Sequence, residues 1–416
     1  MMDVYSLASI ILSLAVLIAY LNHKIIHMQT TVALTTASLL ISVILLCIHH
    51  FGYALYVDRT RELMQSLDFR ALLLNGMLSF LLFAGSMTVD FDSLKKQKWE
   101  IGTLSSLTTI ASAVIVGYAM YLLLNALHIQ LSLIECLLFG ALISPTDPIA
   151  VLSTFKEVGA SKRLTTCVAG ESLFNDGVGI VIFTTIYQIA FMGHAPTWQT
   201  IVLLFCQQTI GGIAYGMLLG LFTHWLIKNL DDHNMMILVT LGVVTGGYAL
   251  ALDCGISGPL AMVVAGIFIG NKSQKGRLHA ESQRTLHTFW EVIDEVLNAV
   301  LFLLIGFELL TINFDQSHII AGLLAIPLVL LIRLITVSVP MQLFARKRKN
   351  EPWTIAILTW GGLRGGLAVA LALSLPTSQS QSLILSMTYA VVTFAVIVQG
   401  LTVKPFVAMA KESQQI

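Results

Sequence analysis

Two aspartates in this sequence stand where a charge is energetically unfavourable. Asp147 lies in Ile143–Pro148 (ISPTDP) and Asp176 lies in Gly170–Gly177 (GESLFNDG), both inside long apolar segments. A charge at the centre of a bilayer costs about 2.5 kcal/mol or more, and such residues commonly mark an ion or proton path. Removal from water favours the protonated carboxyl group, so a proton and a cation can compete for one carboxylate near neutral pH. These two residues predict a transport protein.

The composition places the chain in a membrane. Its 416 residues are 56% hydrophobic and only 11% charged, whereas a soluble domain carries about 25% charged residues. An apolar segment of about 20 residues can cross the hydrocarbon core as a helix. We therefore predict an all-α polytopic membrane protein, one transmembrane domain over residues 1–416 with no soluble domain. Thirteen apolar segments, numbered here as spans 1 to 13, lie near residues 4–21, 30–48, 69–89, 101–127, 129–155, 162–192, 198–227, 234–252, 256–271, 286–310, 317–345, 352–375 and 381–410.

The basic residues predict how the chain is oriented. Of the 23 Lys and Arg residues, 18 fall in one set of alternate loops, and only Arg59, Arg61 and Arg70 fall in the other. Because cytoplasmic loops are enriched in Lys and Arg, we expect the cell (inner) membrane, with the N-terminus outside and the C-terminus in the cytoplasm. The run Arg346–Lys349 is explained most simply as an orientation signal, with contact to membrane lipid as the alternative.

Two spans are interrupted by residues that break helices. Span 5 contains Ser144–Pro148 with two prolines, which remove backbone donors and clash with the preceding turn. Span 12 contains Gly361–Gly366, in which four glycines surround Arg364. Unwound backbone at membrane depth is tolerated only where it is buried in protein or lines a cavity. Kinked packing helices are the alternative, but two multi-residue breaks that each carry a charge favour a functional site.

The positions of the two breaks predict an inverted repeat. Each interrupted span is the fifth of a six-span set, spans 1–6 and 8–13, and the two run in opposite directions. In transporters built this way, crossed broken helices expose half-helix ends to an ion near the midplane. The charges that bracket each span place Asp147, Asp176, Arg333 and Arg364 near that plane.

Span 6 carries two acids that can do different work. Residues four apart share a face of a helix, so Glu171 and Asn175 form one stripe while Ser172 and Asp176 form the next. We expect Asp176 and Ser172 to face the broken helices. A buried Glu171 needs a cationic partner. Both arginines named above are available, and their spacing does not choose between them.

Several motifs together resemble a known family over nearly the whole chain. They are Thr146–Pro148, Gly170–Leu173 with Asn175 and Asp176, Gly361–Gly365, and the apolar helix that bears Arg333. The chain resembles the monovalent cation:proton antiporters of the NhaP type, which include the animal sodium/proton exchangers. The resemblance implies thirteen helices and a homodimer. It also implies a core domain, spans 4–6 and 11–13, that moves like an elevator against a dimerisation domain formed by the other spans.

The same resemblance assigns roles to the residues. It implies that Asp176 carries the cation and the proton, and that Asp147, Ser172, Thr146 and Asn175 complete the site, with Na⁺ held at Asp147, Ser172 and Asp176. It also implies that Glu171 pairs with Arg333, which leaves Arg364 as the charge of the second break. Asn175 stands where electrogenic relatives have a second aspartate, so we expect electroneutral exchange of one cation for one proton.

A further acidic group precedes the middle of span 10. Glu291, Asp294 and Glu295 share one helix face and are interpreted as the rim of a cytoplasmic funnel that concentrates cations. The alternative is a set of acids that interact favourably with the start of a helix. Asn298, deeper in the same span, is expected to serve packing.

The predicted function is exchange of Na⁺, or of K⁺ or Li⁺, for H⁺ by alternating access, with cation and proton competing for Asp176. No GxxxxGK[ST] phosphate loop is present, which argues against an ATP-driven pump. We expect no enzyme activity, no cofactor and no nucleic-acid partner, and a role in sodium and pH homeostasis. The alternatives are a cation channel and an intramembrane aspartyl protease, although neither Asp147 nor Asp176 lies in the Gly-x-Gly-Asp context typical of such proteases.

Overall fold

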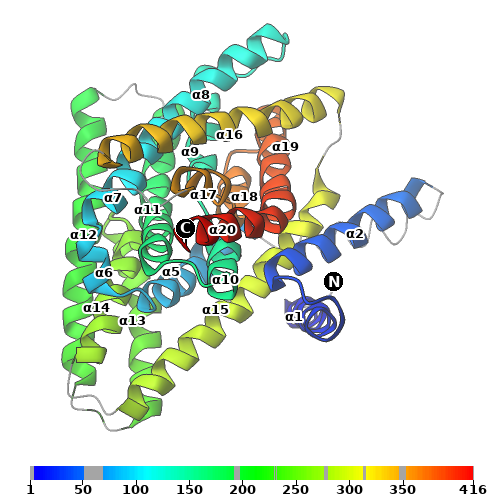
Figure 1. Ribbon diagram of the computed structural model, residues 1–416. Coiled ribbons are helices and arrows are strands. Elements are labelled where there is room, and N and C mark those ends of the chain that lie inside the picture. The colour runs from blue at the N-terminus through cyan, green and yellow to red at the C-terminus, as the bar shows by residue number, and fades with distance from the viewer. Residues whose placement is uncertain are drawn as a thin grey trace.

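The computed structural model describes residues 4–50, 69–191, 197–228, 230, 232–275, 280–312, 315–345 and 353–415 (Figure 1). Within these ranges the chain is helical and contains no β-strand, so the all-α prediction is confirmed. The basic run Arg346–Lys349 and the residues Arg59 and Arg61, which contributed to the predicted orientation, lie outside the described residues.

The helices follow one another along the chain with short connections. Their bounds are α1 Val4–Leu21, α2 Thr30–His50, α4 Phe69–Ala71, α5 Leu78–Met87, α6 Phe91–Lys96, α7 Lys98–Gly102, α8 Thr109–Ala126, α9 Leu133–Ile143, α10 Ile149–Val158, α11 Lys162–Phe191, α12 Trp198–Ile227, α13 His233–Asp253, α14 Gly258–Lys275, α15 Ala280–Glu308, α16 Gln316–Ala345, α17 Thr354–Trp360, α18 Gly366–Leu373, α19 Gln379–Phe394 and α20 Gly400–Gln415. Single π-helical turns extend or join some of them at η1 Asn22–Ile26, η2 Leu72–Met77, η3 Thr103–Thr108 and η5 Ala395–Gln399, and a 3₁₀ turn, η4 Leu309–Thr311, follows α15.

Nine helical segments among the described residues are long and apolar enough to cross a bilayer. They correspond to predicted spans 1–4, 6–8, 11 and 13. Predicted spans 5 and 12 are each present as two short helices, α9 with α10 and α17 with α18. The remaining two are the shorter apolar helix α14 and the more polar helix α15. This architecture is that of a multi-pass membrane protein.

The start and the end of each half of span 5 follow from local chemistry. Ser132 and Glu135 form a capping box at the start of α9, which satisfies two orphan backbone donors. Helix α9 ends at Ile143 because Pro145 cannot continue it. Helix α10 ends at Val158, and the next residue, Gly159, has a φ of 75° that gives the left-handed turn that stops a helix.

The two halves of each broken helix pack in different hydrophobic cores. One core contains buried side chains of α9 and α18 together with α16, α19 and the C-terminal half of α15. The other contains buried side chains of α10 and α17 together with α5, α14 and the N-terminal half of α11. The breaks therefore lie between the two cores, near the centre of the molecule (Figure 1).

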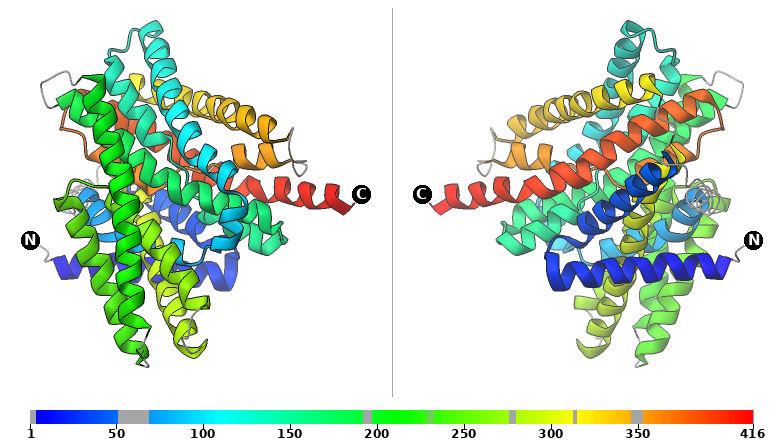
Figure 2. Two further views of the ribbon diagram at one scale, coloured as in Figure 1. Left: turned by 90° about the vertical axis from the view of Figure 1, so that its left-hand side faces the viewer. Right: turned by 90° about the vertical axis from the view of Figure 1, so that its right-hand side faces the viewer.

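Long helices surround these short ones. Helix α9 packs against α8, α11 and α18, whereas α17 packs against α16 and α20. Helices α19, η5 and α20 form one long rod across the molecule, and its C-terminal end lies on the side opposite the start of α1 (Figure 2). The broken segments are consequently enclosed by continuous helices that hold their ends in place.

Candidate functional site

The two breaks meet at one backbone contact. The amide of Asp147 donates a 2.8 Å hydrogen bond to the carbonyl oxygen of Leu363, and this pair forms the single β-bridge of the described chain. A backbone donor and acceptor freed by the breaks thereby satisfy each other, as buried backbone groups must. The proline-containing break of span 5 and the glycine-rich break of span 12 are thus joined directly by a backbone hydrogen bond.

Asp147 lies at the N-terminal ends of both second half-helices. Its Oδ1 accepts a 3.0 Å hydrogen bond from the amide of Ile149, the first residue of α10. Its Oδ2 lies so close to Gly365, which immediately precedes α18, that a Cβ atom there would be 2.4 Å away. Helix N-termini favour negative charge. The Asp147 carboxylate therefore lies beside the starts of both α10 and α18. Gly365 is required next to it because any side chain there would clash with the carboxylate.

The two arginines lie at the C-terminal ends of the first half-helices. Arg364 Nη1 donates to the carbonyl oxygens of Ser144 at 2.5 Å and Pro145 at 2.7 Å, where α9 ends. Arg333 Nη2 donates to the carbonyl oxygen of Leu358 in α17 at 3.1 Å. Carbonyl groups in the last turn of a helix lack intrahelical partners, and cations are favourable there. The first break thus receives the positive charge of Arg364 from the second break, and the second break receives that of Arg333 from α16.

Glu171 forms its ion pair with Arg333. The atoms Glu171 Oε1 and Arg333 Nη2 are 2.5 Å apart, and their side chains are 3% and 4% exposed. A Cβ atom at Gly362 would lie 2.8 Å from Arg333 Nε, so this glycine lets the guanidinium approach the second break. Of the two arginines left open by the helical spacing, the structure places Arg333 beside Glu171.

Thr146 is held by polar side chains of α11. Its backbone amide donates to Asn175 Oδ1 at 3.3 Å, and Asn175 Nδ2 donates to its hydroxyl at 2.8 Å. The Ser172 hydroxyl donates to the Thr146 carbonyl oxygen. One turn further along, a Cβ atom at Gly179 would lie 2.2 Å from Pro145 Cγ. Helix α11 therefore holds the first break through three hydrogen bonds, made by the side chains of Asn175 and Ser172, and through the close approach at Gly179.

Asp176 lies beside these groups and is half-buried. It interacts electrostatically with Asp147 and Arg364. Within the described part of the chain, its carboxylate accepts no hydrogen bond and forms no ion pair closer than 4 Å. Two neighbouring carboxylates, one of them without a protein donor, can share a proton or coordinate a cation in its place.

The predicted funnel acids lie on α15. Glu291 and Glu295 are exposed, whereas Asp294 is half-buried. Asp294 is within hydrogen-bonding reach of Asn298 and interacts electrostatically with Asp147. Asn298 was expected to serve packing. Its spacing of four residues from Asp294 was the signal in the sequence that could have linked them.

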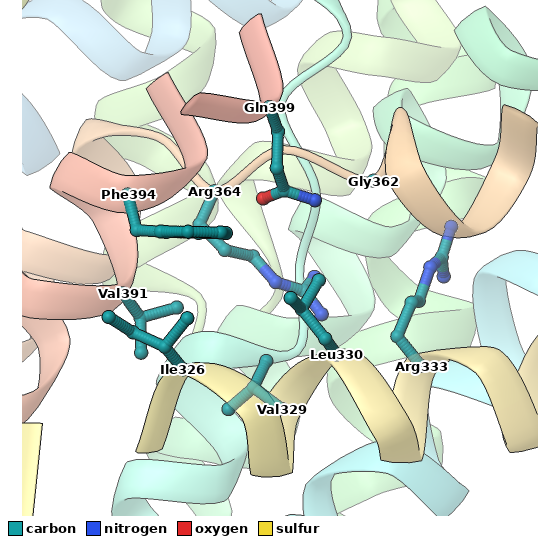
Figure 3. Close-up of a pocket in the computed structure, with 9 residues that line it drawn as sticks. All are labelled: Ile326, Val329, Leu330, Arg333, Gly362, Arg364, Val391, Phe394 and Gln399. Atoms are coloured by element: carbon teal, nitrogen blue, oxygen red, sulfur yellow. The ribbon is translucent and has the colours of Figure 1, made fainter. Parts of the chain in front are cut away.

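A small cavity separates the two arginines (Figure 3). It has room for about one water molecule. Gln399 extends towards Arg364 in this view, and its Nε2 donates a 2.9 Å hydrogen bond to the carbonyl oxygen of Trp360. The other lining residues are mainly apolar: Ile326, Val329, Leu330, Gly362, Val391 and Phe394. In the described residues, no group of three or more His, Cys, Asp or Glu side chains is arranged to hold a metal ion.

Fold and site together define a class of protein. A multi-pass helical membrane protein in which two broken helices meet beside paired carboxylates has the architecture of an ion-coupled secondary transporter. The sequence agrees with this class. The family model described as "Sodium/hydrogen exchanger, transmembrane" matches residues 11–409, and the chain belongs to that family. Its members are transporters and not enzymes.

Individual relatives support the same assignment. The chain is 40% identical over 405 residues to the Na⁺/H⁺ antiporter NhaP of Pseudomonas aeruginosa, covering 96% of each protein. It is 35% identical over 357 residues to the Na⁺/H⁺ antiporter NhaH of Halobacillus dabanensis, covering 84% of this chain and 86% of that one. The predicted resemblance to the NhaP type is therefore confirmed.

A solved structure shows the same fold. The sodium proton antiporter MjNhaP1 from Methanocaldococcus jannaschii superposes with a TM-score of 0.75 at 18% identity, covering 96% of both chains. This similarity supports the helical arrangement described above.

Proposed function

We propose that this protein exchanges Na⁺, or K⁺ or Li⁺, for H⁺ across the cell membrane. Membership of the sodium/hydrogen exchanger family supports this proposal, as do relatives that are named Na⁺/H⁺ antiporters. The observation that carries it is the position of Asp176, next to Asp147 and Arg364 at the junction of the two breaks, without a hydrogen-bond donor from the described protein. The transported cation and proton are the partners, and no cofactor is required.

In this proposal Asp176 binds either the cation or the proton. Asp147 and Ser172 complete the cation site, and the Thr146 region supplies backbone oxygens. The side-chain amide of Asn175 donates to the Thr146 hydroxyl at 2.8 Å and accepts from the Thr146 backbone amide at 3.3 Å. Because both of its polar atoms are used in this way, Asn175 supports the site by holding the first break in place. Glu171 and Arg333 stay ionised as a buried pair and leave the net charge of the site unchanged.

The transport cycle rests on a movement that we infer from the fold. Thirteen spans, with the two broken ones counted once each, form inverted six-helix repeats. The core domain of spans 4–6 and 11–13 moves like an elevator against the other spans, which form the dimerisation domain of a homodimer. The N-terminus lies outside and the C-terminus lies in the cytoplasm. The acids Glu291, Asp294 and Glu295 then attract cations at the cytoplasmic mouth.

One proton is exchanged for one cation in this scheme. Asp176 is the only carrier that changes its occupant, and both of its loaded forms have the same charge. The transmembrane voltage then neither drives nor opposes exchange.

A vesicle assay tests the proposal. Everted membrane vesicles that contain the protein would be given an acidic interior, and Na⁺, K⁺, Li⁺ or choline would be added in turn. We expect at least one alkali cation to dissipate the pH gradient at a rate that saturates with its concentration, whereas choline and vesicles without the protein show no response. Flux that does not saturate would indicate a channel, and no response to any cation would refute exchange.

A further inference from the structure

One face of helix α15 presents a regular series of residues to the core of the molecule. Asp294, Asn298, Leu301, Ile305 and Glu308 are separated by four, three, four and three residues. Residues at these spacings lie on one side of an α-helix. The face therefore has an acidic residue near each end and apolar residues between them, and we refer to it as the α15 stripe.

Three members of the α15 stripe, Asp294, Leu301 and Ile305, lie near the site described above. Asp294 interacts electrostatically with Asp147 and lies next to Asn298. A Cβ atom at Gly366, the first residue of α18, would lie 2.5 Å from Leu301 Cδ1 and 3.1 Å from Ile305 Cδ1. The apolar middle of the stripe thus packs directly against the start of α18, at the second break.

Glu308 ends the stripe on the far side of this apolar contact. It is a carboxylate with 7% exposure, and one oxygen accepts a 2.6 Å hydrogen bond from the Thr311 hydroxyl. It faces Tyr389 of α19, whose hydroxyl donates a 3.4 Å hydrogen bond to the carbonyl oxygen of Gly306. Among the described residues, no Lys, Arg or His forms an ion pair with it.

A buried carboxylate without a cationic partner is unfavourable, and inside a membrane such a residue usually has a function. The α15 stripe places it beyond the apolar contact, on the side opposite Asp294.

We propose that Glu308 attracts the cation at the mouth opposite Asp294. This inference rests on the elevator movement of the proposed function. Glu308 lies three to seven residues beyond the Leu301–Ile305 contact, which is about 5–10 Å along a helix. A displacement of the core domain by that distance would bring Asp147 and Asp176 level with Glu308. The cation would then meet an acidic residue of α15 on either side of the membrane.

The test measures cation affinity separately on each side. Purified wild type and Glu308→Gln would be reconstituted, and the apparent KM for Na⁺ would be determined with Na⁺ on the Asp294 side and then on the Glu308 side. We expect Glu308→Gln to raise KM at least about threefold on the Glu308 side only. Glu308→Asp should restore it, and Asp294→Asn should show the reverse asymmetry. The matched control is Asp315→Asn, an exposed acid near the same end that lies off the stripe.

The outcomes separate this inference from the proposed function. An equal change on both sides, or no change on either, in a protein whose wild type exchanges Na⁺ for H⁺ would overturn the role of Glu308 alone. A wild type that does not exchange at all would overturn the proposed function.

A second variant guards against misfolding of Glu308→Gln. Ile305→Cys would be made after replacement of the five native cysteines, and it leaves Glu308 intact. Ile305 is fully buried in this structure. We expect a membrane-impermeant thiol reagent to modify Cys at this position from the Glu308 side at a rate that depends on the Na⁺ gradient. Complete protection under every gradient would contradict the proposal.

Discussion

The backbone amide of Asp147 lies 2.8 Å from the carbonyl oxygen of Leu363 and joins two helices whose breaks are more than 200 residues apart in the chain. Around this bond the charges are arranged by helix end. Arginines lie at the two C-terminal ends, and Asp147 lies at the two N-terminal ends. Opposite charges thus lie at the ends of four short helices, and the Asp176 carboxylate beside them accepts no hydrogen bond from the described residues.

The close contact between Asp147 and Gly365 gives the first prediction. In Gly365→Ala the new Cβ would lie 2.4 Å from Asp147 Oδ2, so the carboxylate must leave its position. We expect at least a tenfold loss of exchange in proteoliposomes with normal membrane insertion. Gly246→Ala is the matched control, because a Cβ atom there meets no heavy atom within 4 Å. Wild-type exchange by Gly365→Ala would show that the position of Asp147 is not needed.

The buried ion pair gives the second prediction. Removal of one partner of a buried pair typically destabilises a protein by about 3–5 kcal/mol, because the other charge stays buried and unpaired. We expect Glu171→Ala and Arg333→Ala each to lower the melting temperature, and the double variant to lose less than the sum of the two. Thermal unfolding in detergent measures all three. If the losses of melting temperature in the two single variants add up in the double variant, the ion pair contributes no stability. Strong coupling between variants of Glu171 and Arg364 would instead make Arg364 the partner of Glu171.

The third prediction concerns pH and a loop outside the spans. Hydrogen bonds from Ser93 and Lys162 lower the pKa of Asp90 from its usual 3.8 to about 2. A lowered pKa in the folded state means that the ionised form stabilises the fold above pH 4, and that this contribution disappears as the pH falls towards 2. The melting temperature of wild type should therefore exceed that of Asp90→Asn between pH 5 and 7. We expect the difference to shrink steadily in more acidic buffer; a constant difference down to pH 2.5 would contradict this account.

Voltage provides the fourth prediction. Exchange of one cation for one proton at Asp176 moves no net charge, so a potassium gradient clamped with valinomycin should leave the rate of Na⁺-driven proton flux unchanged. The control is a protonophore, which must respond to the same imposed voltage. A voltage that accelerates or reverses Na⁺ flux at a fixed pH gradient would mean that another group, with Asp147 as the nearest, also exchanges a proton.

The sequence predicted which residues form this site better than it predicted which of them contact one another. Two prolines beside Asp147 and four glycines around Arg364 are local signals, since each acts on its own helix. The partner of Glu171 is a long-range choice, and helical spacing left Arg333 and Arg364 equally available. The bonds from Arg364 to Ser144 and Pro145, and the contact that requires Gly365, depend on how two distant segments cross. Glu308 gave no signal because an acid at the end of a span normally reaches water, and only its 7% exposure sets it apart.

We propose that Asp176 carries both the cation and the proton, and a comparison of three proteins tests this role. Wild type, Asp176→Ala and Asp176→Glu would be reconstituted at equal density, and proton flux driven by a Na⁺ gradient would be recorded together with uptake of radioactive Na⁺. We expect that Asp176→Ala inserts, remains folded and shows neither flux, while Asp176→Glu retains part of both fluxes with a higher KM for Na⁺. Coupled Na⁺ and H⁺ flux by Asp176→Ala at the wild-type rate would contradict it.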